Sequence, residues 1–246
     1  MSTFKSLSTL LFLSSLLFAQ NNFLSPKELQ AFKSYKALAS KNLTILEGVD
    51  EGDTYFLKIQ YQKLTKKKIL YAFVNKKSQR VSVGTRYEKD GSESVFPKSP
   101  EAIEQIEEGV FFSFGTGKKE IYMVTDPDCI FCKRFEKATQ GKLGKKYRVH
   151  VIYQVFSFHK KSPAMVSWIM QGKDEREKQR RMEAIMVEGS KGYLPFLKKD
   201  ISPQMKEQIA KGLKASQALE AMGSPMFYDT DFKLIDTGEL VQKLGK

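Results

Sequence analysis

Two cysteines are the only thiols in this 246-residue chain, and they stand three positions apart, at Cys129 and Cys132 in the segment TDPDCIFCKRF. Such a pair could be a structural disulfide, half of a metal site, or a redox-active dithiol. A disulfide at this spacing closes a very short loop and constrains the unfolded chain by only ~2 kcal/mol, against ~3 kcal/mol for a fifteen-residue loop. We therefore expect it to contribute little as a structural disulfide.

A zinc site also fits poorly, because structural zinc needs four ligands, typically from two closely spaced Cys or His pairs. The only histidines, His150 and His159, are nine positions apart, and the chain has no further cysteine. We predict no metal site and no cofactor beyond a redox-active Cys129–Cys132 disulfide.

The segments on either side of the cysteines indicate how they are positioned. The apolar, β-branched run at residues 119–125 predicts a buried strand, and Asp126-Pro127-Asp128 ends it. Phe131, Phe135 and Ala138 then recur at helical spacing, which predicts one face of a helix that ends near Gly141. Cys129 should therefore lie where a strand-end loop becomes a helix.

This position predicts different roles for the two thiols. Unpaired N–H groups and the helix dipole at a helix N-terminus favour a thiolate, and Lys133 and Arg134 add positive charge. Cys129 is thus the expected nucleophile, and Cys132, one turn into the helix, the more buried resolving thiol. A CxxC between a strand and a helix indicates a thioredoxin-like redox motif.

The segment TDPDCIFCKRF resembles the active-site segment of the DsbC/DsbG family, which are periplasmic thiol:disulfide interchange proteins with a thioredoxin fold. The resemblance implies an α+β N-terminal cystatin-like dimerisation domain, a linker helix, and an α/β thioredoxin-fold catalytic domain with a helical insertion. It also implies a homodimer that acts on protein disulfides.

A second motif expected from this resemblance is a cis-proline opposite the cysteines, and Ser224-Pro225 is the best match. It follows a helical segment for which Gly223 would be the C-cap, and it precedes two short strands and a C-terminal helix. The resemblance assigns Ser224 and Pro225 to substrate binding, with serine where the family usually has threonine. The other Ser-Pro pairs predict helix starts with serine as the cap: Ser25-Pro26, Ser99-Pro100, Ser162-Pro163 and Ser202-Pro203.

The N-terminal region has a different character. Ser25 and Glu28 form a capping-box pattern that predicts a helix through about Ser40. Alternating strands follow at residues 54–62, 69–74 and 80–87, with a turn at Asp90-Gly91. We assign residues 20–96 to the dimerisation domain, 97–116 to the linker helix and 117–246 to the catalytic domain.

Between the cysteines and Pro225, residues 147–156 predict a strand and residues 162–189 a helical insertion. The insertion carries Trp168 and several methionines, which we expect in the core rather than in a substrate cleft. These methionines are Met165, Met170, Met182 and Met186.

The first residues indicate export. Lys5, an apolar run over residues 7–18 and a small residue at Ala19 are typical of a signal peptide at residues 1–19, cleaved near Ala19. The apolar run is too short to span a bilayer, which takes ~20 residues. The expected location is the periplasm, where disulfides persist.

The chain is basic, with a formal charge of +13, but its lysine pairs fall in predicted turns without interleaved aromatic residues. We expect no nucleic-acid partner.

The expected activity is disulfide isomerase or reductase. Ile130 and Phe131 between the cysteines are the redox-tuning pair, and they lack the histidine of strongly oxidising relatives of this fold. The alternatives are a dimeric disulfide oxidase of the same fold, or a periplasmic chaperone for unfolded proteins. Expected partners are misfolded or unfolded secreted proteins with cysteines and a membrane thiol redox partner. We find no acidic residue suited to proton transfer within the strand before the motif, so proton transfer to or from Cys132 stays unassigned.

Overall fold

The chain divides into two compact units, with the division after Pro100. The structure, a computed structural model, describes residues 22–139 and 141–245, so the predicted signal peptide lies outside the described residues. Within this described part, no helix is long and apolar enough to cross a membrane.

The first unit is a helix on an antiparallel sheet with strand order β1-β2-β3-β4. Its elements are α2 (Pro26–Ala31), the 3-10 helix η1 (Phe32–Ser34), β1 (Leu43–Asp50), β2 (Thr54–Lys63), β3 (Lys66–Asn75) and β4 (Val81–Val83). The capping box is confirmed, because the backbone N–H of Glu28 donates to Ser25 Oγ and the Ser25 N–H donates back to the Glu28 carboxylate.

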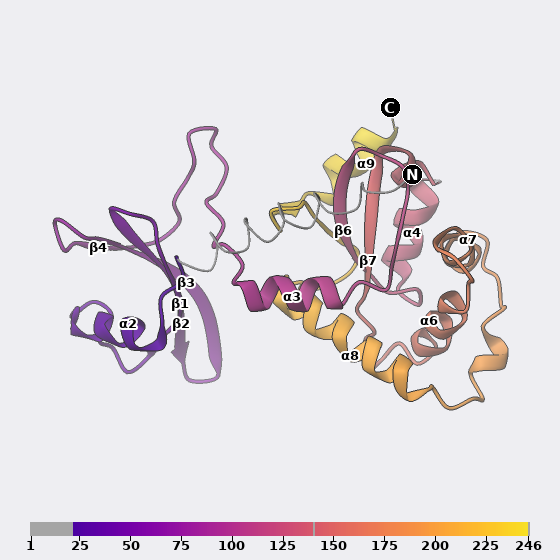
Figure 1. Ribbon diagram of the computed structural model, residues 1–246, viewed down its shortest axis with the longest axis horizontal. Coiled ribbons are helices and arrows are strands. Elements are labelled where there is room, and N and C mark those ends of the chain that lie inside the picture. Colours follow the sequence, from indigo (N-terminus) through magenta and orange to yellow (C-terminus); the bar gives the residue numbers. More distant parts are fainter. Residues whose placement is uncertain (1–21, 140, 246) are drawn as a thin grey trace, which may run out of the picture. The chain divides into compact units, whose positions relative to one another are not determined.

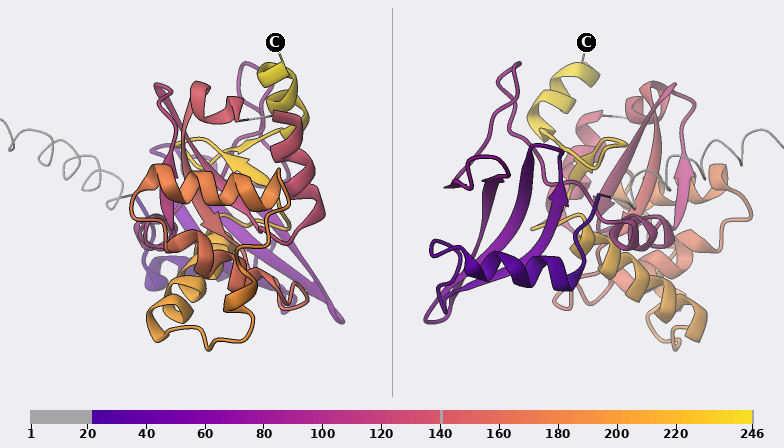
Figure 2. Two further views of the ribbon diagram at one scale, coloured as in Figure 1. Left: turned by 90° about the vertical axis from the view of Figure 1, so that its right-hand side faces the viewer. Right: turned by 60° about the vertical axis from the view of Figure 1, so that its left-hand side comes forward.

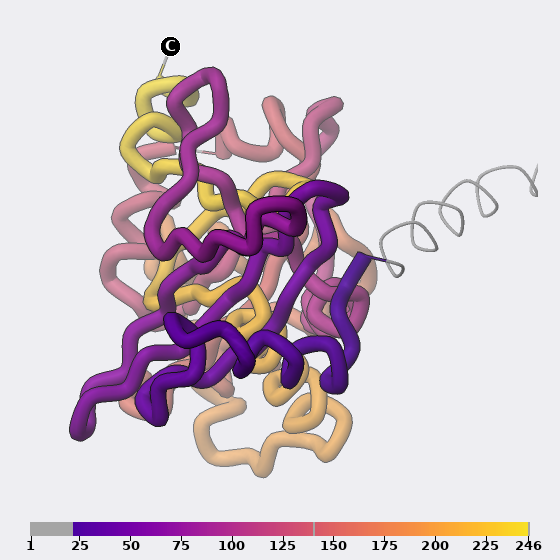
Figure 3. The backbone as a smooth tube through the Cα atoms, turned by 90° about the vertical axis from the view of Figure 1, so that its left-hand side faces the viewer, coloured from indigo at the N-terminus to yellow at the C-terminus, as the bar shows by residue number. Residues whose placement is uncertain are grey.

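Strand alternation gives this sheet two apolar faces. One face presents Leu57 and Ile59 to α2 and η1, where Phe32 and Leu38 are buried against them. Figures 2 and 3 show α2 lying across the strands. The opposite face carries Phe56, which is covered by Phe96 and by the Arg86 guanidinium. A unit of this size thus buries both faces of its sheet.

Two features of this unit differ from the sequence prediction. Strand β1 was not predicted, because a bulge between Ile45 and Glu47 interrupts its alternation. The first helix ends at Ala31 rather than near Ser40, since Phe32 and Leu38 both turn into the sheet core. Tertiary packing overrides helical propensity here.

The second unit is built on a mixed sheet with strand order β5-β7-β6-β8-β9. These strands are β5 (Phe112–Phe114), β6 (Lys119–Thr125), β7 (Tyr147–Tyr153), β8 (Met226–Tyr228) and β9 (Leu234–Ile235). Strands β6 and β7 run parallel, and β8 joins β6 in the antiparallel sense. The central pair β6 and β7 is labelled in Figure 1.

Helices cover both faces of this sheet. They are α3 (Pro100–Glu108), α4 (Ile130–Thr139), α5 (Lys142–Lys146), α6 (Ser162–Met170), α7 (Glu175–Met186), the 3-10 helix η2 (Leu194–Phe196), α8 (Pro203–Ala218) and α9 (Thr237–Gly245). Ile121 and Met123 of β6 face a core built with α4, α6, α7 and α9, whereas Val124 faces α3 and α8. Figures 1 and 2 show this arrangement of helices around β6 and β7.

The helical insertion is confirmed as α6 and α7. Met165, Met182 and Met186 are buried in the core as expected, and Trp168 and Met170 pack against it half-buried.

The range predicted as a linker helix is only partly helical. Helix α3 packs on the second unit through the fully buried Ile106, and Phe112–Phe114 form the edge strand β5 beside β7. The run FFSF is therefore part of the sheet, because its apolar side chains are buried on both faces.

Two local predictions are wrong. Helix α8 ends at Ala218, well before Gly223, because Glu220 takes the left-handed conformation (φ +58°). The Ala221 N–H then donates to the Ser216 carbonyl in a Schellman motif. Ser162 is not the cap of α6; Lys161 holds that position, and the buried Ser162 hydroxyl donates to Asp126 instead.

Candidate active site

Cys129 and Cys132 lie at the start of helix α4. Strand β6 ends at Thr125, and the Cys129 N–H donates to the Asp126 carbonyl (3.1 Å), which closes the turn before Ile130 begins the helix. Both cysteines are free thiols. Cys129 is 6% exposed and Cys132 fully buried. The predicted junction of strand, loop and helix is confirmed, and the two thiols differ in access.

The loop at Ser224 and Pro225 faces the first thiol. Cys129 Sγ donates to the Ser224 carbonyl at 3.6 Å, and the Ser224–Pro225 peptide bond is cis, as expected. Pro225 leads directly into β8, whose Met226 pairs with Val124 of β6. Two sequence motifs 95 positions apart therefore meet at one sulfur.

The second thiol has a strongly apolar setting. Burial raises the pKa of the Cys132 thiol far above its ordinary value, and the charge of Cys129 adds to this. Hydrogen bonds from the Ser224 hydroxyl, the Thr125 hydroxyl and the Asp126 N–H oppose the increase in this pKa. The buried Ser224 Oγ has no other hydrogen-bond partner in the described residues. Cys132 thus needs help to lose its proton.

The two residues between the cysteines are exposed. Ile130 is 57% and Phe131 61% exposed, and the Arg134 guanidinium lies over the Phe131 ring. Lys133 forms an ion pair with Asp128 (3.5 Å), so its charge is partly compensated next to the motif. The redox-tuning role of Ile130 and Phe131 stays a prediction.

The buried face of α4 differs from the predicted one. Phe131 and Ala138 point to solvent, and the buried residues are Cys132, Phe135, Glu136 and Thr139. The sequence prediction relied on the apolar residues alone. It therefore placed the buried face of this helix about one position away from the observed one. As a result it missed Glu136, an acidic residue that is only 4% exposed.

A second buried acid, Asp126, fastens the loop before Cys129. One of its carboxylate oxygens accepts from the Ser162 hydroxyl and the Asp128 N–H, and the other accepts from His159 Nδ1 (2.9 Å) and the Phe156 N–H (3.2 Å). Four donors use the acceptor capacity of both oxygens. Asp126 therefore ties the cysteine loop to the segment between β7 and α6.

Glu136 lacks such partners. Its Oε1 has no hydrogen-bond partner in the described residues, and burial raises its pKa to about 7, with the charge of Glu183 as a smaller cause. The hydroxyl of the fully buried Tyr153 is likewise unpaired within this part of the chain. Burial, then the charges of Glu136 and Asp126, raise the pKa of Tyr153 far above its ordinary range.

The two histidines both contact carboxylates. His159 binds Asp126, and His150 lies between Ser113 (2.8 Å) and Glu120 (3.0 Å) on neighbouring strands. Glu120, at the start of β6, is 54% exposed, so strand β6 itself supplies no buried carboxylate.

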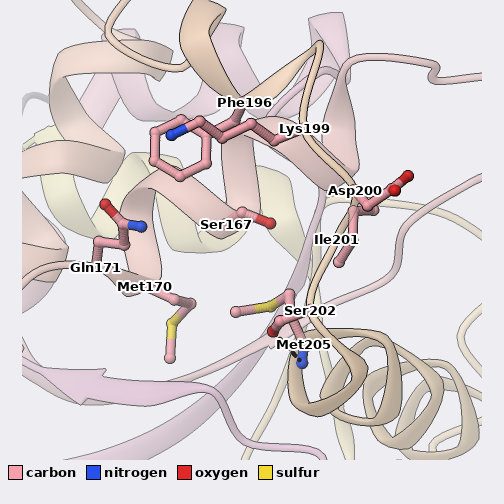
Figure 4. Close-up of a pocket in the computed structure, with 9 residues that line it drawn as sticks. All are labelled: Ser167, Met170, Gln171, Phe196, Lys199, Asp200, Ile201, Ser202 and Met205. Atoms are coloured by element: carbon pink, nitrogen blue, oxygen red, sulfur yellow. Dashed lines mark hydrogen bonds between the residues drawn. The ribbon is translucent and has the colours of Figure 1, made fainter.

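A separate cavity of about 250 Å³ lies between α6, the segment after η2 and the start of α8. Figure 4 shows Met170, Met205 and Phe196 around it, with Lys199 over the Phe196 ring. The residues that line it do not include the cysteines or Ser224 and Pro225, so we do not assign it to the redox site.

Comparison with known proteins supports the interpretation of the second unit. A family model described as a thioredoxin-like domain matches residues 114–217, whereas no curated protein matches the chain.

Several solved structures are similar to part of this chain at low sequence identity. Proteus mirabilis ScsC in a compact conformation is 17% identical over 58% of this chain and 78% of its own, with a TM-score of 0.42. A disulfide interchange protein from Neisseria gonorrhoeae is 16% identical over 57% of this chain and 98% of its own, with a TM-score of 0.39. The match to residues 114–217 agrees with the site geometry, and this part of the second unit is similar to a thioredoxin-like domain, which is the coarse level at which the resemblance to the DsbC/DsbG family holds.

Proposed function

We propose that the protein is a thiol-disulfide oxidoreductase that acts on protein disulfides, with Cys129 as the nucleophile and Cys132 as the resolving thiol. The observation that carries this proposal is the asymmetry of the pair. Cys129 precedes the first residue of α4 and contacts the Ser224 carbonyl, whereas Cys132 is fully buried one turn further on. A helix N-terminus favours the thiolate form of the first cysteine.

The reaction is a pair of thiol-disulfide exchanges. The Cys129 thiolate attacks one sulfur of a substrate disulfide, and the other substrate sulfur leaves as a thiolate that takes up a proton. The mixed disulfide is then resolved in one of two ways. A substrate thiolate attacks the substrate sulfur and releases Cys129, which is isomerisation, or Cys132 attacks Cys129 Sγ and the substrate is reduced by two electrons.

The surface around Cys129 suits an unfolded polypeptide. Ile130, Phe131, Phe158 and Met222 expose from 57% to 95% of their surface. Phe158 belongs to the segment tied to Asp126, and Met222 stands two residues before Ser224. Exposed apolar side chains next to a reactive thiol favour misfolded secreted proteins with cysteines as substrates. Ser224 and Pro225 would position the substrate backbone beside Cys129.

The preferred direction is isomerisation or reduction. Ile130 and Phe131 place no positive charge between the cysteines, so the reduced form gains less stabilisation than it does in strong oxidants. A dimeric oxidase of the same fold is the alternative, and the reduction potential separates the two. The exposed apolar side chains near Cys129 also suit a chaperone activity of the same surface.

We further propose that the first unit is a cystatin-like dimerisation domain and that the exported protein is a periplasmic homodimer reduced by a membrane thiol partner. The short edge strand β4 supports this proposal, because Val83 at that edge is 51% exposed. Light scattering on the full-length protein tests the assembly, and a monomer at micromolar concentration would rule out the dimer.

Trapping experiments test the activity itself. Reduced Cys132→Ser should accumulate a mixed disulfide with a denatured substrate protein that contains disulfides, because no internal thiol can resolve it. Cys129→Ser should trap little and should lose reductase activity. Equal trapping by both variants would refute the assigned roles.

A further inference from the structure

The end of the second unit that lies away from the cysteines carries many cations. Strands β6 and β7 run parallel and both begin at this end, where Lys119 is paired with Tyr147. At their other ends, β6 leads to Cys129 and β7 to the segment that binds Asp126. Because a strand of 7 residues spans roughly 20 Å, the reactive thiol and these cations are well separated.

Contacts between several elements hold this end together. Helix α5 leads directly into β7, and Lys146 donates to the carbonyl of Lys243 in the last turn of α9 (2.8 Å). The start of α7 joins them, because Arg148 at the start of β7 donates to the Glu175 carboxylate (2.8 Å). Figure 1 shows α9 beside α4 and β6. We call this region the basic end and define it by six exposed residues: Lys118, Lys119, Lys142, Lys145, Arg176 and Lys243.

Local stability explains only part of this charge. Helices α4 and α9 end here, and Lys137 and Lys243 in their last turns complement the helix dipoles. Arg176 instead stands in the first turn of α7, where the helix dipole disfavours a cation. Lys118 and Lys119 lie in no helix. These three cations therefore bring no such benefit to the fold.

A recess lies within the basic end. A cavity of about 430 Å³ has Lys145, Arg148 and Arg176 in its lining, with Glu175 as the single acid among the lining residues. Gly115 also lines it, and the left-handed backbone there (φ +89°) leaves this wall without a side chain. The recess thus combines net positive charge with open backbone, which suits a phosphate group. The acidic side chains on these elements are fewer than the cations, and each has a hydrogen bond or an ion pair: Glu120, Asp174, Glu175 and Glu239.

The chemistry of the basic end favours a diffuse anionic surface over a nucleic acid or a folded protein. Its cations are mostly lysines, which act as point charges on flexible stems. Among the described residues, none of the exposed large apolar side chains belongs to the segments that form the basic end. It therefore offers neither stacking for bases nor an apolar interface core. Each Lys or Arg near a bilayer with anionic lipids strengthens binding by about fivefold.

We propose that the basic end binds the surface of a bilayer that contains anionic phospholipids, with a lipid phosphate in the recess. Bound in this way, the second unit holds Cys129 away from the bilayer, because the thiol lies beyond the other end of β6. The protein is then kept at a membrane while its reactive thiol stays open to substrates in solution. This inference goes beyond the proposed function and does not require the thiols to react.

Sedimentation of the full-length protein with lipid vesicles tests the proposal. We expect binding to vesicles of phosphatidylcholine and phosphatidylglycerol in about 0.1 M salt, and release in about 1 M salt, where the Debye length falls from ~10 Å to ~3 Å. Vesicles of phosphatidylcholine alone should bind little protein. Equal binding to both kinds of vesicle, or binding that resists salt, would contradict an electrostatic contact.

A matched pair of variants locates the contact. Replacing Lys118, Lys142 and Lys145 with glutamine should weaken binding to the anionic vesicles at least about tenfold. The control replaces the three exposed lysines at 66–68, at the start of β3 in the first unit, and should change the affinity less than about twofold. Both variants should reduce a small disulfide at the wild-type rate, which shows that they are folded. Equal weakening by the two variants would overturn the proposal, because net charge alone would then explain the binding.

Two further measurements test the orientation and the kind of partner. Cys129 of the vesicle-bound protein should react with a water-soluble alkylating reagent as fast as in the free protein, whereas protection by the vesicles would contradict the proposed orientation. A single-stranded oligonucleotide should compete poorly with the anionic vesicles. An oligonucleotide that binds the protein more tightly than the vesicles do would assign the basic end to nucleic acid and overturn the proposal.

Discussion

The two buried acids on either side of the cysteine pair are held in opposite ways. Asp126, before Cys129, accepts hydrogen bonds from four donors that belong to three segments of the chain. Glu136, after Cys132, keeps an oxygen without a partner in the described residues and has a pKa of about 7. A fully bonded carboxylate fixes a loop, whereas an unpaired one is able to exchange protons near neutral pH.

The largest effect on stability should come from Asp126. Asp126→Ala leaves the buried Ser162 hydroxyl and the His159 and Phe156 N–H groups without their acceptor, so we expect a loss of ~3–5 kcal/mol in the free energy of unfolding. Urea denaturation measures it. The control is Asp128→Ala, which removes a partly exposed ion pair and should cost under ~1 kcal/mol. Equal losses in the free energy of unfolding of the two variants would contradict the claim that the hydrogen bonds of Asp126 fix this loop.

Glu136 should make the stability of the protein depend on pH. Its pKa rises from 4.5 to about 7 on folding, so the folded state holds this proton more tightly. The stabilisation is complete below pH 4.5 and is lost as pH rises to about 7. The shift corresponds to ~3 kcal/mol. Between pH 4.5 and pH 8 the free energy of unfolding of the wild type should therefore fall by ~3 kcal/mol more than that of Glu136→Gln. Urea titrations of both proteins at each pH measure this difference. Parallel curves for the two proteins would contradict the raised pKa.

The dipeptide Ile130-Phe131 between the cysteines should affect the stability of the Cys129 thiolate. Replacing Ile130 and Phe131 with Pro and His adds an imidazolium at the helix N-terminus and stabilises the Cys129 thiolate. We expect the reduction potential to rise by about 40 mV, which is ~2 kcal/mol for a two-electron couple. Equilibration with glutathione measures it. A potential that is unchanged or more negative would mean that this dipeptide does not set the redox poise.

The smallest effect should come from the Ser224 hydroxyl. It opposes the increase in the pKa of Cys132, so Ser224→Ala should raise that pKa further and slow resolution by roughly fivefold, about 1 kcal/mol. Ser224→Thr keeps the hydroxyl and should restore the rate. The measurement is the reaction of the reduced protein with dithiobis(nitrobenzoate), in which Cys132 resolves the mixed disulfide on Cys129 and releases the second thionitrobenzoate. Slowing by Thr as large as that by Ala would assign the effect to loop packing instead.

Much of the active-site framework could be predicted from sequence, because it depends on local signals. The apolar run of β6, the turn at Asp126-Pro127-Asp128 and the start of α4 follow from short-range patterns. The position of Pro225 before β8 followed from a turn, two short strands and a helix.

The two buried acids could not be found in this way. Asp126 appeared as a loop breaker, and its burial depends on Ser162 and on the segment with Phe156 and His159, all about 30 residues away. Glu136 stands beside Phe135, and the apolar pattern Phe131, Phe135, Ala138 left it outside the predicted face. One sequence signal was present: Glu136 is four residues after a cysteine that was itself expected to be buried.

The measurement that tests the central claim most directly is the rate at which each thiol of the reduced protein is alkylated near neutral pH, followed by mass spectrometry of the modified peptides. The account predicts that Cys129, at the helix start and beside the exposed Ile130, is labelled well before Cys132, whose burial raises its pKa. Equal rates, or faster labelling of Cys132, would contradict the assignment of nucleophile and resolving thiol.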